Sequence, residues 1–194
     1  MDIKSICVYC ASSSQIDRKY ADAAYALGEE MAARGITLVN GAGNQGLMRA
    51  SADGCLQHGG QAVGIIPSFM IVEGWCHQGM TRLVETPDMH VRQQKMAEQS
   101  DAAIFLPGGC GTLAEMSELI TWKQLGLYLK PIVILNTGGY YDCLLRFLRQ
   151  AADERFMRQQ HTALWRVAST PHEALDLVED TPQWDTSIRR FASL

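Results

Sequence analysis

The segment with the clearest chemical potential is the run LPGGCGTLAE at 106–115, which joins the apolar stretch 102–106 to a helical pattern. Gly108, Gly109 and Gly111 let the backbone come close to a ligand without side-chain clash. The first N–H groups of the following helix lack intrahelical partners and point at any anion seated there. The run therefore predicts a phosphate-binding loop with the carboxylate of Glu115 beside it, which favours chemistry on a phosphorylated small molecule such as a nucleotide.

Glu115 also has a purely structural interpretation. Thr112 and Glu115 have the spacing of a capping box, in which each side chain satisfies the other's backbone N–H, and from spacing alone this interpretation is favoured. The helical wheel places an apolar stripe toward the sheet, formed by Leu113, Met116, Ile120 and Leu127. The opposite side carries Glu115, Glu118 and Trp122, which form either solvated surface or the edge of a pocket completed by another subunit.

Arg92 lies in the first turn of a helix expected to begin near Asp88, where a cation opposes the positive end of the helix dipole. Four interpretations are open. Arg92 is a solvated side chain, a partner of Glu98, a bidentate clamp for phosphate, or the group that orients the acid.

Two further turns follow strands and could approach a phosphate. GAGNQG at 41–46 fits G-x-G-x-x-G, but the next strand ends at 64–67 without the acidic residue that a dinucleotide site requires, which disfavours NAD. Gly43 and Gly46 therefore either approach a mononucleotide or form a tight turn. Ser12, in the turn 11–14, could donate to phosphate or ribose, although a single serine more often caps a helix.

Composition limits the remaining function classes. The net charge of −4, without a run of like charges, argues against sequence-independent binding of polymeric nucleic acid. The six cysteines show no disulfide or zinc spacing, and Cys7 and Cys10 on one strand would point to opposite faces. We expect no metal and no cofactor. Because the sequence has neither an apolar stretch of membrane-span length nor a signal-peptide pattern, we expect a cytoplasmic protein.

Strand and helix patterns alternate along the chain, which predicts an α/β, Rossmann-like three-layer fold: a parallel β-sheet flanked by helices on both faces. Ligands then bind beyond the carboxyl ends of the strands. The expected strands are 6–10, 36–40, 62–66, 82–85, 102–106, 132–135 and 165–168, and the expected helices are 17–34, 46–58, 89–99, 112–128, 140–156 and 171–179. We expect one domain over 1–194, an irregular lid at 68–79 and a loosely packed tail after 182.

Three motifs in this order carry a family resemblance: PGGCGTLAE (107–115), ITWKQLG (120–126) and KPIVILNTGGYYD (130–142). The chain resembles the LOG family of cytokinin riboside 5′-monophosphate phosphoribohydrolases, whose older label is lysine decarboxylase. The family signature is PGGxGTxxE, preceded by a helix with MHxRK, and the segments CVYCASS and GNQGLM also correspond.

The resemblance implies hydrolysis of the N-glycosidic bond of a nucleoside 5′-monophosphate to free base and ribose 5-phosphate. It also implies a homodimer with the site near the subunit interface. Arg92 and Glu115 fall on the family's catalytic arginine and glutamate. The substrate-binding residues that we expect are Ser12, Gly43, Gly46, Met89, Gly108, Gly109, Gly111, Thr112 and Glu118.

This chain departs from the family pattern at Ala42, Arg49, Gln93 and Ala114, which leaves the base preference open. Two alternatives to a hydrolase remain. One is a non-catalytic carrier of a nucleotide or of molybdenum cofactor; the other is that the glycines and glutamates are only turns and caps. A decarboxylase dependent on pyridoxal phosphate would need a Schiff-base lysine, and no lysine here has recognisable surroundings for that role.

Overall fold

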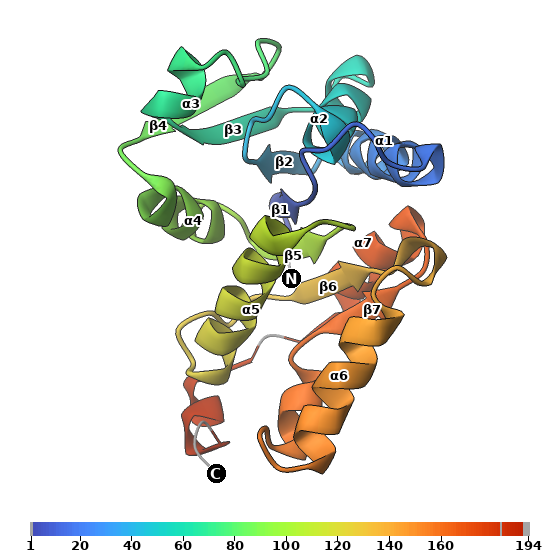
Figure 1. Ribbon diagram of the computed structural model, residues 1–194, viewed down its shortest axis with the longest axis vertical. Helices are drawn as coiled ribbons and strands as arrows, with labels where there is room; N and C mark the ends of the chain where they lie inside the picture. Colours follow the sequence, from blue (N-terminus) through green and yellow to red (C-terminus); the bar gives the residue numbers. More distant parts are fainter. Residues whose placement is uncertain (1, 183, 192–194) are drawn as a thin grey trace.

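The computed structural model describes residues 2–182 and 184–191, which form an α/β fold around one central sheet (Figure 1). Within these residues the sheet has seven strands in the order β4-β3-β2-β1-β5-β6-β7, and every neighbouring pair is parallel. The strands are β1 (Ser5–Tyr9), β2 (Thr37–Asn40), β3 (Ala62–Pro67), β4 (Arg82–Thr86), β5 (Ala102–Phe105), β6 (Ile132–Leu135) and β7 (Arg166–Ala168).

Helices cover both faces of the sheet, and Figure 1 shows α4 and α5 on the opposite side from α1 and α2. The α-helices are α1 (Arg18–Ala33), α2 (Gly46–Gln57), α3 (Ser68–Val72), α4 (Met89–Glu98), α5 (Cys110–Gln124), α6 (Asp142–Asp153) and α7 (Pro171–Asp180). Three short 3-10 helices are η1 (Thr137–Gly139), η2 (Gln159–Ala163) and η3 (Thr186–Phe191). The predicted three-layer α/β fold is confirmed.

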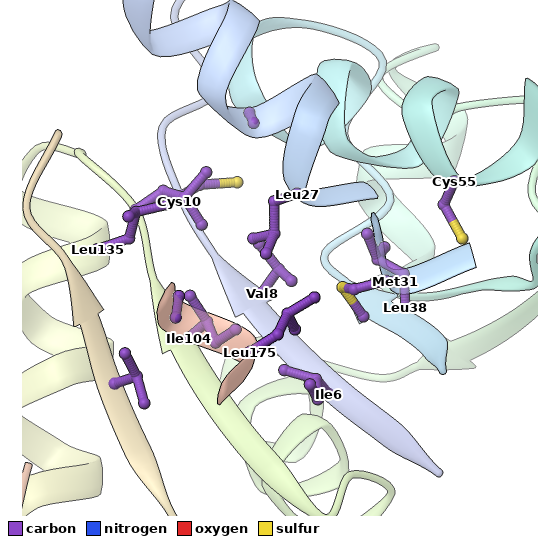
Figure 2. Close-up of a cluster of buried hydrophobic side chains, with 14 of the residues drawn as sticks. Ile6, Val8, Cys10, Leu27, Met31, Leu38, Cys55, Ile104, Leu135 and Leu175 are labelled. Atoms are coloured by element: carbon purple, nitrogen blue, oxygen red, sulfur yellow. The ribbon is translucent and has the colours of Figure 1, made fainter. Parts of the chain in front are cut away.

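The central strands are buried on both faces, as expected for a parallel sheet between two helical layers. One face packs against α1, α2 and α7, where Val8, Leu27 and Leu175 meet in one apolar cluster (Figure 2). The other face packs against α4, α5 and α6. Cys10 belongs to the first cluster and Cys7 to the second, so the two thiols lie on opposite faces of the sheet, as the strand spacing predicts.

The direction of winding changes between β1 and β5. The chain builds outward from β1 to β4, then returns to place β5 on the other side of β1 and continues to β7. The loops that leave β1 and β5 therefore diverge at adjacent strand ends, which opens a crevice at such a switch point. The loops touch at their bases, where the Ala11 N–H donates to the Pro107 carbonyl over 3.2 Å.

Three local expectations differ from the structure. The helix expected over 112–128 is α5, which begins at Cys110 and ends at Gln124, so Leu127 lies beyond it and is exposed instead of facing the sheet. The segment 68–79, expected to be irregular, contains the short helix α3. In the tail, expected to be loosely packed, η3 buries Ile188 against the second apolar cluster, while its other described side chains are exposed; Gln183 and residues 192–194 lie outside the described residues.

Candidate active site

The loop between β5 and α5 presents the first turn of α5 to open space. The N-cap of α5 is Gly109, and no side chain caps this end of the helix. A Cβ added to Gly109 or Gly111 would meet nothing within 4 Å, whereas one on Gly108 would lie 2.1 Å from the Thr112 hydroxyl oxygen. Gly108 is therefore needed for packing inside the loop. Gly109 and Gly111 keep the backbone open to a ligand.

The capping box expected between Thr112 and Glu115 is wrong. Because α5 begins at Cys110, Thr112 is the third residue of the helix and cannot be its N-cap. The Glu115 carboxylate turns instead toward α4, where its Oε1 atom accepts a hydrogen bond of 3.0 Å from Nη1 of Arg92.

Arg92 is buried, and its guanidinium is held from two sides. Besides the bond to Glu115, its Nε–H donates to the Ile65 carbonyl of β3 over 3.2 Å. A Cβ on Gly41 would lie 1.9 Å from Nη2, so the guanidinium passes directly over this glycine. Two interpretations of Arg92 are therefore wrong: it is not solvated, and it does not pair with Glu98, which accepts a hydrogen bond from Gln94.

Burial controls the protonation of Glu115. Its side chain is 13% exposed, and removal from water raises its pKa above the ordinary glutamate value. The charge of Arg92 and its hydrogen bond act in the opposite direction, and the negative charge of Glu118 adds to the increase. The site thus holds a poorly solvated carboxylate, which can interact strongly with positive charge that develops on a ligand.

Arg92 and Glu115 open into a cleft of about 420 Å³ at the strand ends. Its lining also includes Cys10, Ala11, Ser12, Ser13, Met48, Met70, Met89, Gly109, Cys110, Gly111 and Thr112. A second hollow of about 340 Å³ shares Ser12, Met48 and Met70 with this cleft and extends to Gly43, Asn44, Gln45 and Trp75. Together they offer an anion-attracting end at the start of α5 and, beside it, apolar side chains (Met48, Met70) with polar groups at their edge, which suits a phosphorylated compound with a partly apolar body.

Most of the predicted site residues come together here. Ser12, Met89, Gly109, Gly111 and Thr112 line the cleft with Arg92 and Glu115, and Gly43 lines the second hollow. The other three lie just outside these linings, namely Gly46, Gly108 and Glu118.

Gly46 has a positional role instead. Its φ is +62°, and a Cβ there would come within 2.5 Å of the Ser12 backbone, so only glycine lets the turn after β1 rest against the start of α2. The next N–H, from Leu47, donates to the Ala11 carbonyl over 2.9 Å. The three glycines of the G-x-G-x-x-G pattern thus allow close approaches of Arg92 to Gly41, of Met48 to Gly43 and of Ser12 to Gly46.

The sequence reasoning missed Met48 and Met70, which line both hollows. Met48 looks like an ordinary apolar residue of an amphipathic helix, and Met70 lies in a segment with no clear pattern. Cys110 was missed as well, although its position inside the glycine-rich loop was a usable signal.

Across the described ranges, no group of three or more His, Cys, Asp and Glu side chains is arranged to hold a metal ion. Among the helices in the same ranges, none is long and apolar enough to cross a membrane.

Comparison with known families gives one consistent match. Residues 48–178 match the family described as possible lysine decarboxylase. A probable cytokinin riboside 5′-monophosphate phosphoribohydrolase of Oryza sativa subsp. japonica, LOGL6, is 40% identical over 176 residues, covering 91% of this chain and 70% of the relative. The cytokinin riboside 5′-monophosphate phosphoribohydrolase LOG7 of Arabidopsis thaliana is 39% identical over 191 residues, covering 98% and 86%.

Solved structures share the fold at lower identity. The X-ray structure of TM1055 has a TM-score of 0.72 at 22% identity, with coverage of 92% of this chain and 100% of that one. The molybdenum cofactor binding protein of Rippkaea orientalis has a TM-score of 0.70 at 24% identity, with coverage of 92% and 97%. At this level of sequence identity, the two matches support the fold alone.

Proposed function

The chain belongs to the family of cytokinin riboside 5′-monophosphate phosphoribohydrolases, and we propose that it hydrolyses the N-glycosidic bond of a nucleoside 5′-monophosphate to free base and ribose 5-phosphate. The observation that carries this proposal is the buried ion pair of Arg92 and Glu115 in the same cleft as the uncapped N-terminus of α5. An anion site and a poorly solvated carboxylate in one cleft are the two groups that this reaction needs.

The reaction breaks the bond between the base nitrogen and the anomeric carbon. Positive charge grows on the ribose in the transition state, and a carboxylate held nearby stabilises it. Glu115 takes this role and also accepts a proton from the attacking water, whose oxygen forms the new bond to the anomeric carbon. The electron pair of the broken bond leaves with the base, which is released after taking up a proton.

Arg92 holds the Glu115 carboxylate through one oxygen and is itself fixed by the Ile65 carbonyl. The charge of Arg92 opposes the rise in the pKa of Glu115 that burial causes, and the hydrogen bond restricts the rotation of the carboxylate. The 5′-phosphate binds the N–H groups at the start of α5, beside Gly109, Gly111 and Thr112. Binding energy from this remote group orients the ribose against Glu115, so loss of the phosphate should lower turnover as well as affinity.

The base then lies toward the apolar side of the cleft, near Met48, Met70 and Met89. We place Ser12 and Gly43 at the polar edge of the base, since both residues line the second hollow, which continues from the cleft. Glu118 tunes Glu115 through its charge.

We further propose that a homodimer forms over the outer surface of α4 and α5. Met89, which lines the cleft, is exposed, and so are Leu125 and Leu127 at the end of α5. Covering these apolar side chains would place a second subunit at the edge of the cleft. Sedimentation velocity on the purified protein tests the stoichiometry. We also propose that the protein acts in the cytoplasm.

The test of the reaction is release of base from a panel that includes AMP, AMP alkylated on its exocyclic amine, the corresponding nucleosides, and lysine. We expect base and reducing sugar from the monophosphates and no carbon dioxide from lysine. Glu115→Gln keeps the size and one hydrogen-bond acceptor of the side chain but loses its charge. We expect this variant to lose at least 100-fold in kcat/KM, about 3 kcal/mol of transition-state stabilisation.

Circular dichroism and thermal unfolding of Glu115→Gln control for folding. Base release by this variant at the wild-type rate would refute the role of Glu115. Tight retention of a nucleotide by the wild type with no release of base would instead support a carrier.

A further inference from the structure

The run NTGGYYD at 136–142 follows β6, and the function described above leaves it without a role. It forms an unusually constrained turn. Gly138 and Gly139 have φ values of +62° and +74°, a region that favours glycine. The Asn136 side chain closes the turn, because its Oδ1 atom accepts from the Tyr141 N–H over 2.6 Å and its amide donates to Asp142 over 2.7 Å.

This turn brings the hydroxyl groups of two consecutive tyrosines, Tyr140 and Tyr141, to the loop between β5 and α5. The hydroxyl of Tyr141 is buried and donates to the Leu106 carbonyl over 2.7 Å, at the end of β5. The hydroxyl of Tyr140 reaches further along the same loop and donates to the Gly108 carbonyl over 2.8 Å. Two side chains that are 32 and 35 positions away in sequence from the carbonyls they bind thus hold both ends of the segment that leads into α5.

The Tyr140 ring is fixed by its neighbours even though it is half exposed. It packs edge-on against Tyr141 and against Tyr20 of α1, with ring centroids 5.0 Å and 5.7 Å apart. Restricting the ring in this way lowers the entropy cost of keeping the hydroxyl on the Gly108 carbonyl.

A trans peptide directs its C=O and N–H groups to opposite sides, and the chain has no cis peptide among the described residues. The Gly108 carbonyl and the Gly109 N–H belong to one peptide unit. Since Tyr140 holds the carbonyl from outside the cleft lining, the Gly109 N–H is turned toward the cleft, which Gly109 does line. A glycine pair with no Cβ would otherwise rotate easily about this peptide.

We propose that Tyr140 is a positioning residue: its hydroxyl fixes the Gly108–Gly109 peptide so that the Gly109 N–H and the first turn of α5 are preorganised for the 5′-phosphate. This inference rests on the proposed function, because it names the group that prepares the phosphate subsite. Tyr141 anchors the strand end in the core, and Tyr140 acts on the ligand-facing peptide.

The experiment uses the full chain with Tyr140→Phe, which removes only the hydroxyl, and Tyr140→Ala, which also removes the ring. Binding of ribose 5-phosphate is measured by calorimetry, and hydrolysis of the preferred nucleoside monophosphate by steady-state kinetics. Tyr25→Phe is the matched control, since it removes a hydroxyl that donates to Gln57, at the opposite end of α2 from the cleft.

For Tyr140→Phe we expect about a tenfold higher Kd for ribose 5-phosphate and a similar rise in KM, with a smaller change in kcat and an unchanged Tm. Tyr25→Phe should match the wild type in ligand binding. If Tyr140→Phe binds ribose 5-phosphate like the wild type, the hydroxyl has no positioning role and the inference fails, even where Tyr140→Ala is impaired. A wild-type protein that neither binds this sugar phosphate nor releases base would overturn the proposed function itself.

Discussion

The position of Arg92 depends on a residue that carries no chemistry of its own. The guanidinium reaches Glu115 only because Gly41 leaves room above the end of β2. Of the four interpretations that the sequence leaves open for Arg92, the contact with Glu115 favours orientation of the acid, which stays part of our proposal. The choice could not be made earlier, because Arg92 and Glu115 are 23 positions apart and their contact requires β3, β5, α4 and α5 to be placed first.

Gly41→Ala should therefore impair catalysis without unfolding the protein. The added methyl group overlaps Nη2 of Arg92, which lies at the flexible end of a side chain and can move aside. Displacing the guanidinium releases the Glu115 carboxylate from its fixed orientation. We expect kcat/KM to fall about tenfold to a hundredfold, since a misplacement of about 1 Å can have that effect, with Tm changed by only a few degrees.

Steady-state kinetics and differential scanning calorimetry on the same preparation check the two halves of this expectation. If Gly41→Ala keeps the wild-type kcat/KM, the prediction is wrong, and catalysis does not depend on the exact position of the Arg92 guanidinium.

At the scale of elements, the helix starts are where sequence and structure diverge most. The spacing of Thr112 and Glu115 predicts a capping box with Thr112 as N-cap, yet the N-cap of α5 is Gly109, three residues earlier, and no side chain caps this end. The proposed phosphate subsite gives a reason for the missing side-chain cap. A side chain satisfying those N–H groups would compete with a ligand, so the helix end is left less stable than its sequence allows. By contrast, Asp88 at the start of α4 and Thr170 at the start of α7 accept the expected hydrogen bonds from the N–H groups of Val91 and Glu173.

Two glycines control how α1 and α2 pack. A Cβ on Gly28 would lie 2.0 Å from the Ser51 carbonyl oxygen, and one on Gly54 would lie 2.1 Å from the Tyr25 carbonyl oxygen. Both neighbours are backbone atoms of the other helix, so the helices touch without intervening side chains. Since α2 begins at Gly46, beside Ser12 of the cleft, this contact also sets the position of one wall of the site.

Gly28→Ala should destabilise the fold by about 3 kcal/mol, the upper end of overpacking costs, because backbone cannot give way as a side chain can. At an exposed position in a helix, Gly→Ala would stabilise the fold by up to about 1 kcal/mol. The sign of the change in the free energy of unfolding therefore distinguishes the two situations. The double variant with Gly54→Ala should cost less than the sum of the two single changes, since one separation of the helices relieves both overlaps. Urea denaturation measures the free energy of unfolding of the two single variants and the double variant. Additive costs would contradict a shared contact.

For the whole molecule, the alternation of strands and helices was sufficient to predict the layers and the edge of the sheet that binds ligand. Each of the expected strands is present, and the residues at their carboxyl ends, such as Ser12 and Gly109, meet in one cleft. The order of the strands and the exposure of the last segments were not predictable in this way. Ile188 and Leu127 have ordinary apolar side chains, and only the completed packing decides that one is buried and the other is not.

Lys123 is a further case in which tertiary structure overrides residue type. It lies in α5 as a completely buried lysine, and its ammonium donates to the Lys130 carbonyl. Lys130 in turn donates to carbonyls at the C-terminal end of α4, including those of Ala97 and Ser100. This pair ties α4, α5 and the start of β6 together. Removal from water lowers the pKa of Lys123 from 10.5 to about 8.

Stability should respond to this shift in a defined direction. Between about pH 8 and pH 10.5 the unfolded state holds the Lys123 proton and the folded state has lost it, so this residue adds stability as the pH rises. Below pH 8 both states are charged, and the full cost of burying the ammonium is present, on the order of 3 kcal/mol.

Lys123→Met removes that cost and also removes the donor to the Lys130 carbonyl, which offsets part of the gain at neutral pH. The offset does not depend on pH, so the free energy of unfolding of the variant minus that of the wild type should fall by up to about 3 kcal/mol from pH 7 to pH 10. Lys130, whose pKa burial also lowers, contributes to the pH dependence of both proteins, so its effect cancels in the difference. Urea denaturation at several pH values measures this difference in the free energy of unfolding. Lys4→Met, which replaces a solvent-exposed lysine, is the control, and its difference from the wild type should not change with pH. Parallel curves for Lys123→Met and the wild type would mean that the buried ammonium keeps its proton throughout.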